Sequence, residues 1–287
     1  MKIKIAAFLI CMMLPVVAFA ADDAEALLNK AVDELVRKGY VGDISAAQRY
    51  LQAILEQQPD HLEAQWQLFY IQLASLTNTK LSDRAQGLSA ISPEFDRIAK
   101  LAKQSKKQAF LHFMTAMHAS YYEAYERSLS EIERALALEP QSVRYATAKG
   151  RLLIGYGKRT KLDAEIEKGI DVLKKSRELF QKEPSPFVHD ENYDFLIADA
   201  IATLSKPRWK EVAEHYRRFT EKPQASFAYA FAWNNASIAY KELGECDKAK
   251  EAAEKALKVM KFGAAESNKR YAEFCIEMQK MGLMVKK

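Results

Sequence analysis

Apolar residues recur every three or four positions along almost the whole chain beyond residue 24. This spacing gathers the apolar side chains on one stripe of an α-helix. No stretch shows the strict apolar–polar alternation of a half-buried β-strand, so we expect an all-α fold. The pattern predicts thirteen helices, at 24–37, 45–57, 62–76, 93–103, 108–122, 127–138, 142–156, a long helix ending near 182, 192–204, 208–221, 225–243, 247–260 and 264–281.

Prolines recur at the same position relative to the ends of alternate predicted helices. Pro59, Pro140, Pro184 and Pro223 each follow the last apolar residues of a second helix, and Lys261 takes this place in the last pair. Proline recurs there because it ends a helix just beyond its last turn. Successive separations are 81, 44, 39 and 38 residues, so the first interval should contain two units. We therefore expect about six antiparallel helix pairs, with 264–281 as a capping helix.

The last predicted pair carries a recognisable set of residues: Trp233, Ala239, Tyr240, Gly244, Ala249, Ala256 and Leu257. Alanines fit where two helix backbones approach, and glycine fits the left-handed residue that follows a helix. This stretch resembles the tetratricopeptide repeat family. The resemblance implies a right-handed α-solenoid, a single domain at 21–287, and a concave face that binds a peptide segment or a partner protein. The repeat intervals exceed the family's usual length of about 34 residues, so the array is divergent.

The N-terminus has the three parts of a secretory signal peptide. Lys2 and Lys4 form a basic start, residues 5–17 are apolar, and Ala18 and Ala20 form a small-x-small cleavage site. We predict cleavage of residues 1–20 and localisation in a bacterial periplasm. A membrane anchor is the competing interpretation, but the apolar run is shorter than the roughly 20 residues that span a bilayer.

Net charge and cysteine content add little to the predicted fold and function. The net charge is +5, and the segment 1–20 contains two lysines and no acidic residue, which leaves +3 for the remainder. This balance does not indicate nucleic-acid binding. Cys246 and Cys275 could pair in an oxidising compartment. A turn near Gly263 would leave them five residues out of register, about 7 Å of helix rise, which favours two small core residues over a disulfide.

The resemblance also indicates which side chains face the concave groove. In the last pair these are Asn234, Asn235, Ile238 and Lys241. The primary amide of Asn235 could satisfy both an N–H and a C=O of a bound peptide, or simply be exposed polar filler. Arg144 and Arg151 take the matching positions of the fourth pair. Together they could grip a carboxylate or phosphate, or form ordinary salt bridges.

The same count places an apolar strip on the inner face of the second and third pairs. Its members are Trp66, Tyr70, Leu73, Phe110, Phe113, Met114, Met117 and Tyr121. One interpretation is that the strip is core, covered by the predicted loop at 77–92 or by an added helix. The alternative is an apolar pocket around Trp66, Tyr70, Phe113 and Met117 for a lipid-like or small organic ligand, which would make the chain a carrier.

Catalytic chemistry has little support in the sequence. His112 and His118 are six residues apart, so on a helix they point to opposite sides. The run His189, Asp190 and Glu191 is best read as a turn with Asp190 as the helix cap. No phosphate-binding glycine loop, nucleophile elbow or CxxC motif occurs. We therefore expect no enzyme activity, cofactor or metal, and favour an adaptor over a carrier.

Overall fold

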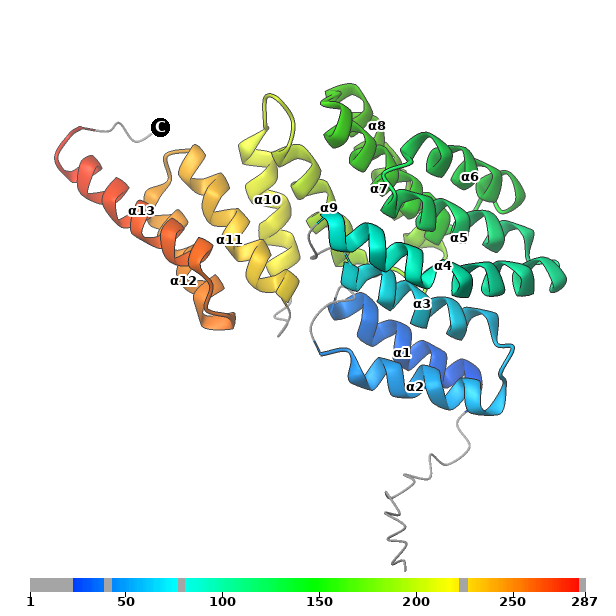
Figure 1. Cartoon of the computed structure of the whole chain (residues 1–287). Coiled ribbons are helices and arrows are strands. Elements are labelled where there is room, and N and C mark those ends of the chain that lie inside the picture. The colour runs from blue at the N-terminus through cyan, green and yellow to red at the C-terminus, as the bar shows by residue number, and fades with distance from the viewer. Residues whose placement is uncertain (1–22, 39–42, 77–80, 222–226, 284–287) are drawn as a thin grey trace, which may run out of the picture.

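A computed structural model describes residues 23–38, 43–76, 81–221 and 227–283 of the chain. These residues form thirteen α-helices and contain no β-strand (Figure 1). The helices are α1 (Ala24–Lys38), α2 (Ser45–Gln57), α3 (Leu62–Leu76), α4 (Leu81–Gln104), α5 (Gln108–Tyr121), α6 (Tyr125–Leu138), α7 (Val143–Thr160), α8 (Asp163–Lys182), α9 (Asp190–Ala202), α10 (Trp209–Thr220), α11 (Phe227–Glu242), α12 (Cys246–Val259) and α13 (Gly263–Lys280).

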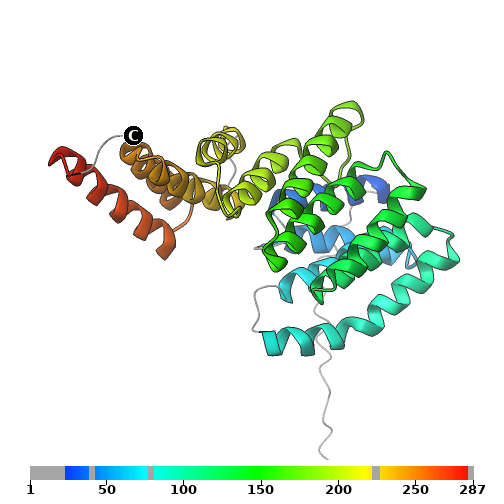
Figure 2. The ribbon, with the colours of Figure 1, turned by 90° about the horizontal axis from the view of Figure 1, so that it is seen from above.

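Consecutive helices pack as antiparallel pairs from α1–α2 to α11–α12, and α13 packs on both helices of the last pair. The prediction of six pairs and a capping helix is therefore confirmed. The solenoid has two parts. The coil, α1–α8, curls tightly, whereas the arm, α9–α13, extends away from it (Figures 1 and 2).

One predicted loop is wrong. Helix α4 begins at Leu81, so most of the segment 77–92 is helical and Pro93 lies inside the helix. Leu88, Phe95 and Ile98 lie on one stripe and are buried against α3 and α5. This burial outweighs the poor helix propensity of the Ser- and Gly-containing sequence. Gly87 packs closely against α3 there, because a Cβ atom would lie 2.5 Å from a methyl carbon of Leu76 and would displace that side chain.

The residues that resemble the tetratricopeptide repeat take the expected places. Ala249 and Ala256 are buried where α12 meets α11. Gly244 has a left-handed φ of 74°. Beyond it, the amide of Glu245 donates to the carbonyl of Tyr240 at 2.9 Å, which closes the end of α11. The cap and the close approach are both confirmed.

Cys246 and Cys275 form a disulfide, with Cα atoms 5.8 Å apart. The expectation of two unbonded core cysteines is therefore wrong. The reason lies in the turn. Helix α12 ends at Val259, and Met260 and Phe262 have extended backbones before α13 begins. The turn is thus centred near Lys261 rather than Gly263, and this places the two cysteines opposite each other.

The predicted signal peptide at 1–20 lies outside the described residues. Within the described part of the chain, no helix is long and apolar enough to cross a membrane.

Candidate functional site

Three adjoining cavities follow helix α7 along the inner face of the coil. The Phe187 groove, ≈ 470 Å³, lies between the start of α7 and the segment 183–187. The inner cavity, ≈ 70 Å³, shares Arg144 and Phe187 with that groove. The tyrosine pocket, ≈ 260 Å³, shares Tyr70, Met117 and Arg151 with the inner cavity.

Arg144 of α7 lies between the Phe187 groove and the inner cavity and connects α7 to α3. Its guanidinium donates to both carboxylate oxygens of Glu63 on α3, at 2.8 and 3.0 Å. The same group lies 4.4 Å from the ring centre of Phe113 and 4.0 Å from that of Phe187. Its side chain is 13% exposed. Of the two alternatives for Arg144, the structure therefore shows a salt bridge within the chain.

The apolar strip is buried. Trp66, Tyr70, Phe113 and Met117 all lie in the hydrophobic core of the coil. Phe187 and Val188 of the α8–α9 connection line the inner cavity above these residues, and no residue of α4 does. Leu88 of the segment 77–92 lies in the same core and Ile91 packs against it, so α4 also contributes to covering the strip. The remaining ≈ 70 Å³ is far below the roughly 300 Å³ of a small-molecule site, so the geometry does not support the pocket for a lipid-like ligand.

The tyrosine pocket is built from α3, α4, α5, α6 and α7. Its described wall consists of Tyr70, Arg84, Met117, Ser120, Tyr121, Glu123, Tyr125, Arg151, Leu152 and Gly155. The pocket thus combines two guanidinium groups with three phenol rings. The carboxylate of Glu123 is paired with Arg159 at 2.9 Å, which offsets its charge.

Local sequence features shape this pocket. Glu123 has a left-handed φ of 58°, which turns the chain between α5 and α6 and brings Tyr121 and Tyr125 to one wall. Gly155 lets Tyr125 pack closely on α7, because a Cβ atom would lie 2.9 Å from the ring. Burial, reinforced by Glu123, raises the pKa of Tyr125, so its hydroxyl stays protonated and able to donate a hydrogen bond.

Comparison with known proteins identifies the architecture. No protein-family model and no curated protein matches this chain. The apo form of the quorum sensor NprR from B. thuringiensis matches at 14% identity over 91% of this chain and 72% of that chain, with a TM-score of 0.51. A signal transduction ATPase with a tetratricopeptide repeat sensor, from Pyrococcus horikoshii, matches at 15% identity over 88% and 37%, with a TM-score of 0.50. This chain has a tetratricopeptide-repeat fold.

Asn234 and Asn235 take the inner positions of that tetratricopeptide-repeat fold, but in the arm rather than the coil. Asn234 is only 4% exposed and accepts a hydrogen bond from Asn268 of α13 at 2.9 Å. Asn235 donates to the hydroxyl of Tyr216 on α10 at 3.1 Å. The expectation that Asn234 faces an open groove is wrong, because α13 covers it.

The four predicted partner-binding residues therefore do not form one site. Arg144 and Arg151 line the cavities of the coil, whereas Asn234 and Asn235 connect helices of the arm. The sequence missed Arg84 because it lies in the segment predicted as a loop. It also missed Tyr125, which stands two residues before the predicted start of its helix.

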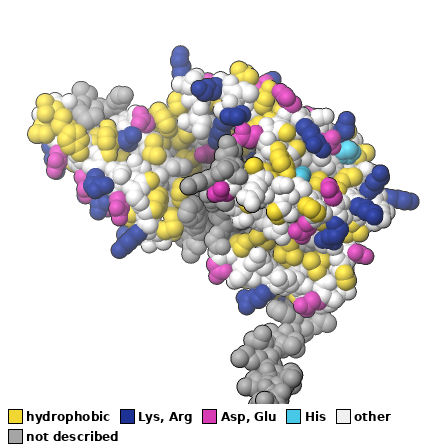
Figure 3. Space-filling model, viewed as in Figure 1, with side chains coloured by type: hydrophobic (Ala, Val, Ile, Leu, Met, Phe, Trp, Pro, Cys, Tyr) yellow, Lys and Arg dark blue, Asp and Glu magenta, His cyan; other side chains and the backbone are white. Residues whose placement is uncertain are grey.

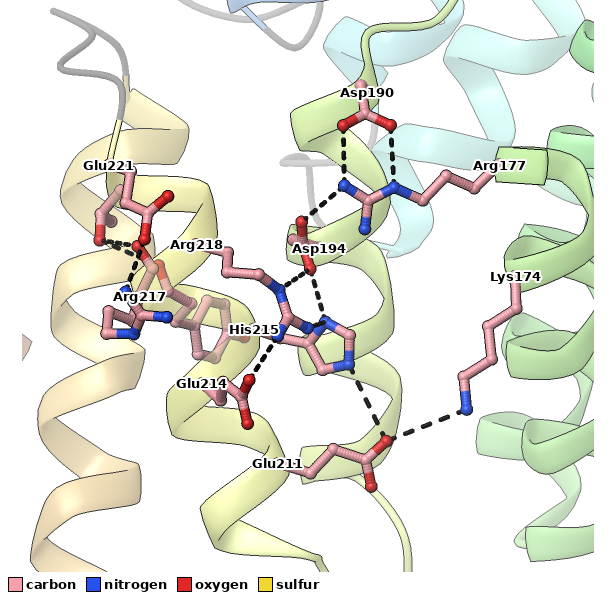
Figure 4. A network of polar contacts seen from close by, with 12 residues as sticks. Lys174, Arg177, Asp190, Asp194, Glu211, Glu214, His215, Arg217, Arg218 and Glu221 are labelled. Carbon is pink, nitrogen blue, oxygen red and sulfur yellow. Dashed lines mark hydrogen bonds and ion pairs between the residues drawn. The ribbon is translucent and has the colours of Figure 1, made fainter. Parts of the chain in front are cut away.

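A buried ionic network joins α8, α9 and α10 of the tetratricopeptide-repeat fold (Figure 4). Asp194, with a side chain 3% exposed, contacts Arg177 at 3.1 Å, Arg218 at 2.9 Å and His215 at 2.7 Å. Burial opposes its ionisation, but the hydrogen bonds from His215 and Arg218 and the charge of Arg177 hold the pKa of Asp194 below its usual value. Arg177 on α8 of the coil and Arg218 on α10 of the arm thus meet at one buried carboxylate of α9, which joins the coil to the arm.

The histidines serve structural contacts. His112 bonds Glu131 at 2.7 Å, and His118 stacks on Phe95 with ring centres 3.9 Å apart. His189 stands before α9 and lies 3.3 Å from Asp33 of α1. Asp190 is not the helix cap, because its carboxylate accepts two hydrogen bonds from Arg177. The described residues contain no group of His, Cys, Asp and Glu that could hold a metal ion.

Proposed function

We propose that this chain is an exported, non-catalytic adaptor that binds an acidic peptide segment of a partner protein in the tyrosine pocket. The observation that carries the proposal is the presence of Arg84 and Arg151 in one cavity with the rings of Tyr70, Tyr121 and Tyr125.

The chemistry of the wall favours a carboxylate. Guanidinium groups hold carboxylates through paired, charge-assisted hydrogen bonds, and a protonated Tyr125 hydroxyl adds a further donor. The phenol rings offer apolar surface to the rest of an inserted side chain.

The size of the pocket favours a segment over a free small molecule. Its ≈ 260 Å³ is below the usual range of about 300–1,000 Å³ for sites that enclose a whole ligand. A peptide can insert one acidic side chain, or its terminal carboxylate, while the rest of the segment lies outside.

Export is part of the proposal. It is motivated by the basic start, apolar run and small-x-small site of residues 1–20. The disulfide between Cys246 and Cys275 supports it, because such bonds persist outside the reducing cytosol.

The test is binding of labelled short peptides that differ only in the number and place of Asp and Glu, measured by fluorescence anisotropy. Acidic peptides should bind, and their Asn and Gln counterparts should bind at least about tenfold more weakly, since a charged hydrogen bond contributes about 1.5 kcal/mol or more. Arg84→Gln with Arg151→Gln should abolish the difference while the helical circular-dichroism signal is kept.

A matched control is Arg134→Gln, which removes an exposed arginine on α6 outside the pocket and should leave binding unchanged. Equal affinity for acidic and neutral peptides would refute the proposal. If succinate displaced the peptides and bound as tightly as they do, a carrier of small carboxylates would replace the adaptor.

A further inference from the structure

Helix α13 carries an exposed apolar stripe along one side. Tyr271, Phe274 and Met281 are 45%, 55% and 61% exposed, and Met278 lies between them in sequence. The spacing of three, four and three residues places all four side chains along one line of the helix. Hydrophobic side chains gather at this end of the molecule in Figure 3.

The stripe is held on a fixed helix. The disulfide joins Cys275, next to Phe274, to the first residue of α12. The side chain of Gln279 donates to the carbonyl of Gly244 at 2.9 Å. The ammonium of Lys241 lies 5.0 Å from the ring centre of Tyr271. A surface ordered in advance loses little conformational entropy on association, so this stripe is suited to docking.

Charged residues along one edge of the stripe indicate which surface would be complementary to it. Arg270 and Glu277 are both exposed and seven residues apart, on the same side of α13. Within the described part of the chain, neither side chain has an ion-pair partner. An antiparallel copy of α13, related by a two-fold axis near Phe274, would bring Arg270 opposite Glu277 of the other copy. The symmetry repeats this pair on the other side of the axis.

We propose that α13 is a self-association surface, on which a second copy of this chain docks antiparallel through Tyr271, Phe274, Met278 and Met281. The arrangement gives an apolar centre with a charged rim, as protein interfaces commonly have. It is independent of the proposed peptide binding, because α13 lies at the end of the arm, away from the coil that holds the tyrosine pocket (Figure 1).

The first test is sedimentation of the purified protein over a range of concentrations in the analytical ultracentrifuge. The protein should sediment as a dimer at high concentration. Phe274→Glu should be monomeric throughout, because it places two carboxylates at the centre of the interface. Leu138→Glu, which alters an exposed leucine on α6, should still dimerise.

The second test uses the two charges. Arg270→Glu and Glu277→Arg should each weaken self-association by about tenfold or more, since either change converts two attractive pairs into two repulsive ones. An equimolar mixture of the two variants should form a heterodimer, because each acidic edge then meets a basic edge. Circular dichroism and free-thiol titration check that the fold and the disulfide are intact.

A monomeric protein at every concentration would overturn the proposal, as would a dimer that Phe274→Glu leaves intact. If the single reversals weakened the dimer but their mixture did not restore it, the antiparallel arrangement would be wrong.

Discussion

The coil and the arm repeat the same helix pair but fill its inner side with different residues. In the coil, the first helices of the pairs carry bulky rings, and Trp66 and Phe113 lie edge to face with centres 6.0 Å apart. In the arm, the matching side is bridged by Asn234 and Asn268. The coil buries Trp66, Phe69, Leu73 and Met114 completely or nearly so. The core of the last pair consists mainly of alanine.

This difference in side chains accounts for the different curvature of the two parts of the solenoid. Bulky inner side chains in the coil meet across its axis, so Arg144 reaches Glu63, 81 residues away in sequence. In the arm, Asn235 reaches a neighbouring helix, where it donates to Tyr216. A filled inner face closes the first part of the chain on itself. The arm stays extended and presents α13.

The largest expected effect lies at the junction of the two parts. Asp194→Ala should lower the free energy of unfolding by about 3–5 kcal/mol, because it removes the buried carboxylate to which Arg177, Arg218 and His215 all bond. Urea denaturation measures it. Asp199→Ala removes a more exposed carboxylate from the same helix and should change stability by less than about 1 kcal/mol. Similar losses for both would mean that the network does not join coil to arm.

Closing of the coil is tested by Glu63→Ala, which leaves the guanidinium of Arg144 without its carboxylate. We expect a loss of about 2–3 kcal/mol in urea denaturation and a larger radius of gyration by X-ray scattering. Glu63→Leu combined with Arg144→Leu should be less destabilised than Glu63→Ala, because no buried charge remains unpaired. An unchanged radius in Glu63→Ala would contradict the closing role.

The alanine packing of the arm predicts an intermediate effect. Ala249→Leu and Ala256→Leu should each cost about 1–3 kcal/mol, because extra methylene groups force the backbones of α11 and α12 apart. Lys258→Leu adds an apolar side chain at an exposed position of α12 and should be nearly neutral. Equal midpoints of thermal unfolding for the three variants would contradict the proposed packing difference between arm and coil.

The smallest effect concerns His118, on the aromatic side of the coil. Burial first, and then the charge of Arg127, lower its pKa to about 4, whereas Asp96 acts in the opposite direction. The folded state therefore binds fewer protons than the unfolded state between about pH 6.5 and pH 4.

The free energy of unfolding should consequently fall as the pH drops through this window, and no further below it. We expect a loss of about 1–2 kcal/mol, less than the full shift implies because the ring is partly solvated. His118→Phe keeps the stacking on Phe95 and should remove this slope in urea titrations. If the pH dependence of the free energy of unfolding persisted in His118→Phe, other titratable groups would be its source.

Much of the architecture was determined by the sequence itself. The apolar periodicity predicted the first and last residues of α2 and α3 correctly. The regular spacing of the prolines predicted the correct number of helix pairs. Gly244 and the alanines located the last pair, because caps and close helix approaches restrict single positions. Helix α4 was the main failure, since its apolar stripe is interrupted by Ser, Gly and Pro and is stabilised by burial against neighbouring helices.

The candidate site was decided by the tertiary structure. Arg84 and Arg151 come from helices far apart in the chain, and the sequence does not encode their approach in any local pattern. The pairing of Arg144 with Glu63 and of Cys246 with Cys275 depends on the rotation from one pair to the next and on the extended turn before α13. Helix periodicity reports only which face of each helix is apolar. How successive pairs turn relative to one another follows from the sum of their packing contacts, and that sum decides which polar side chains meet.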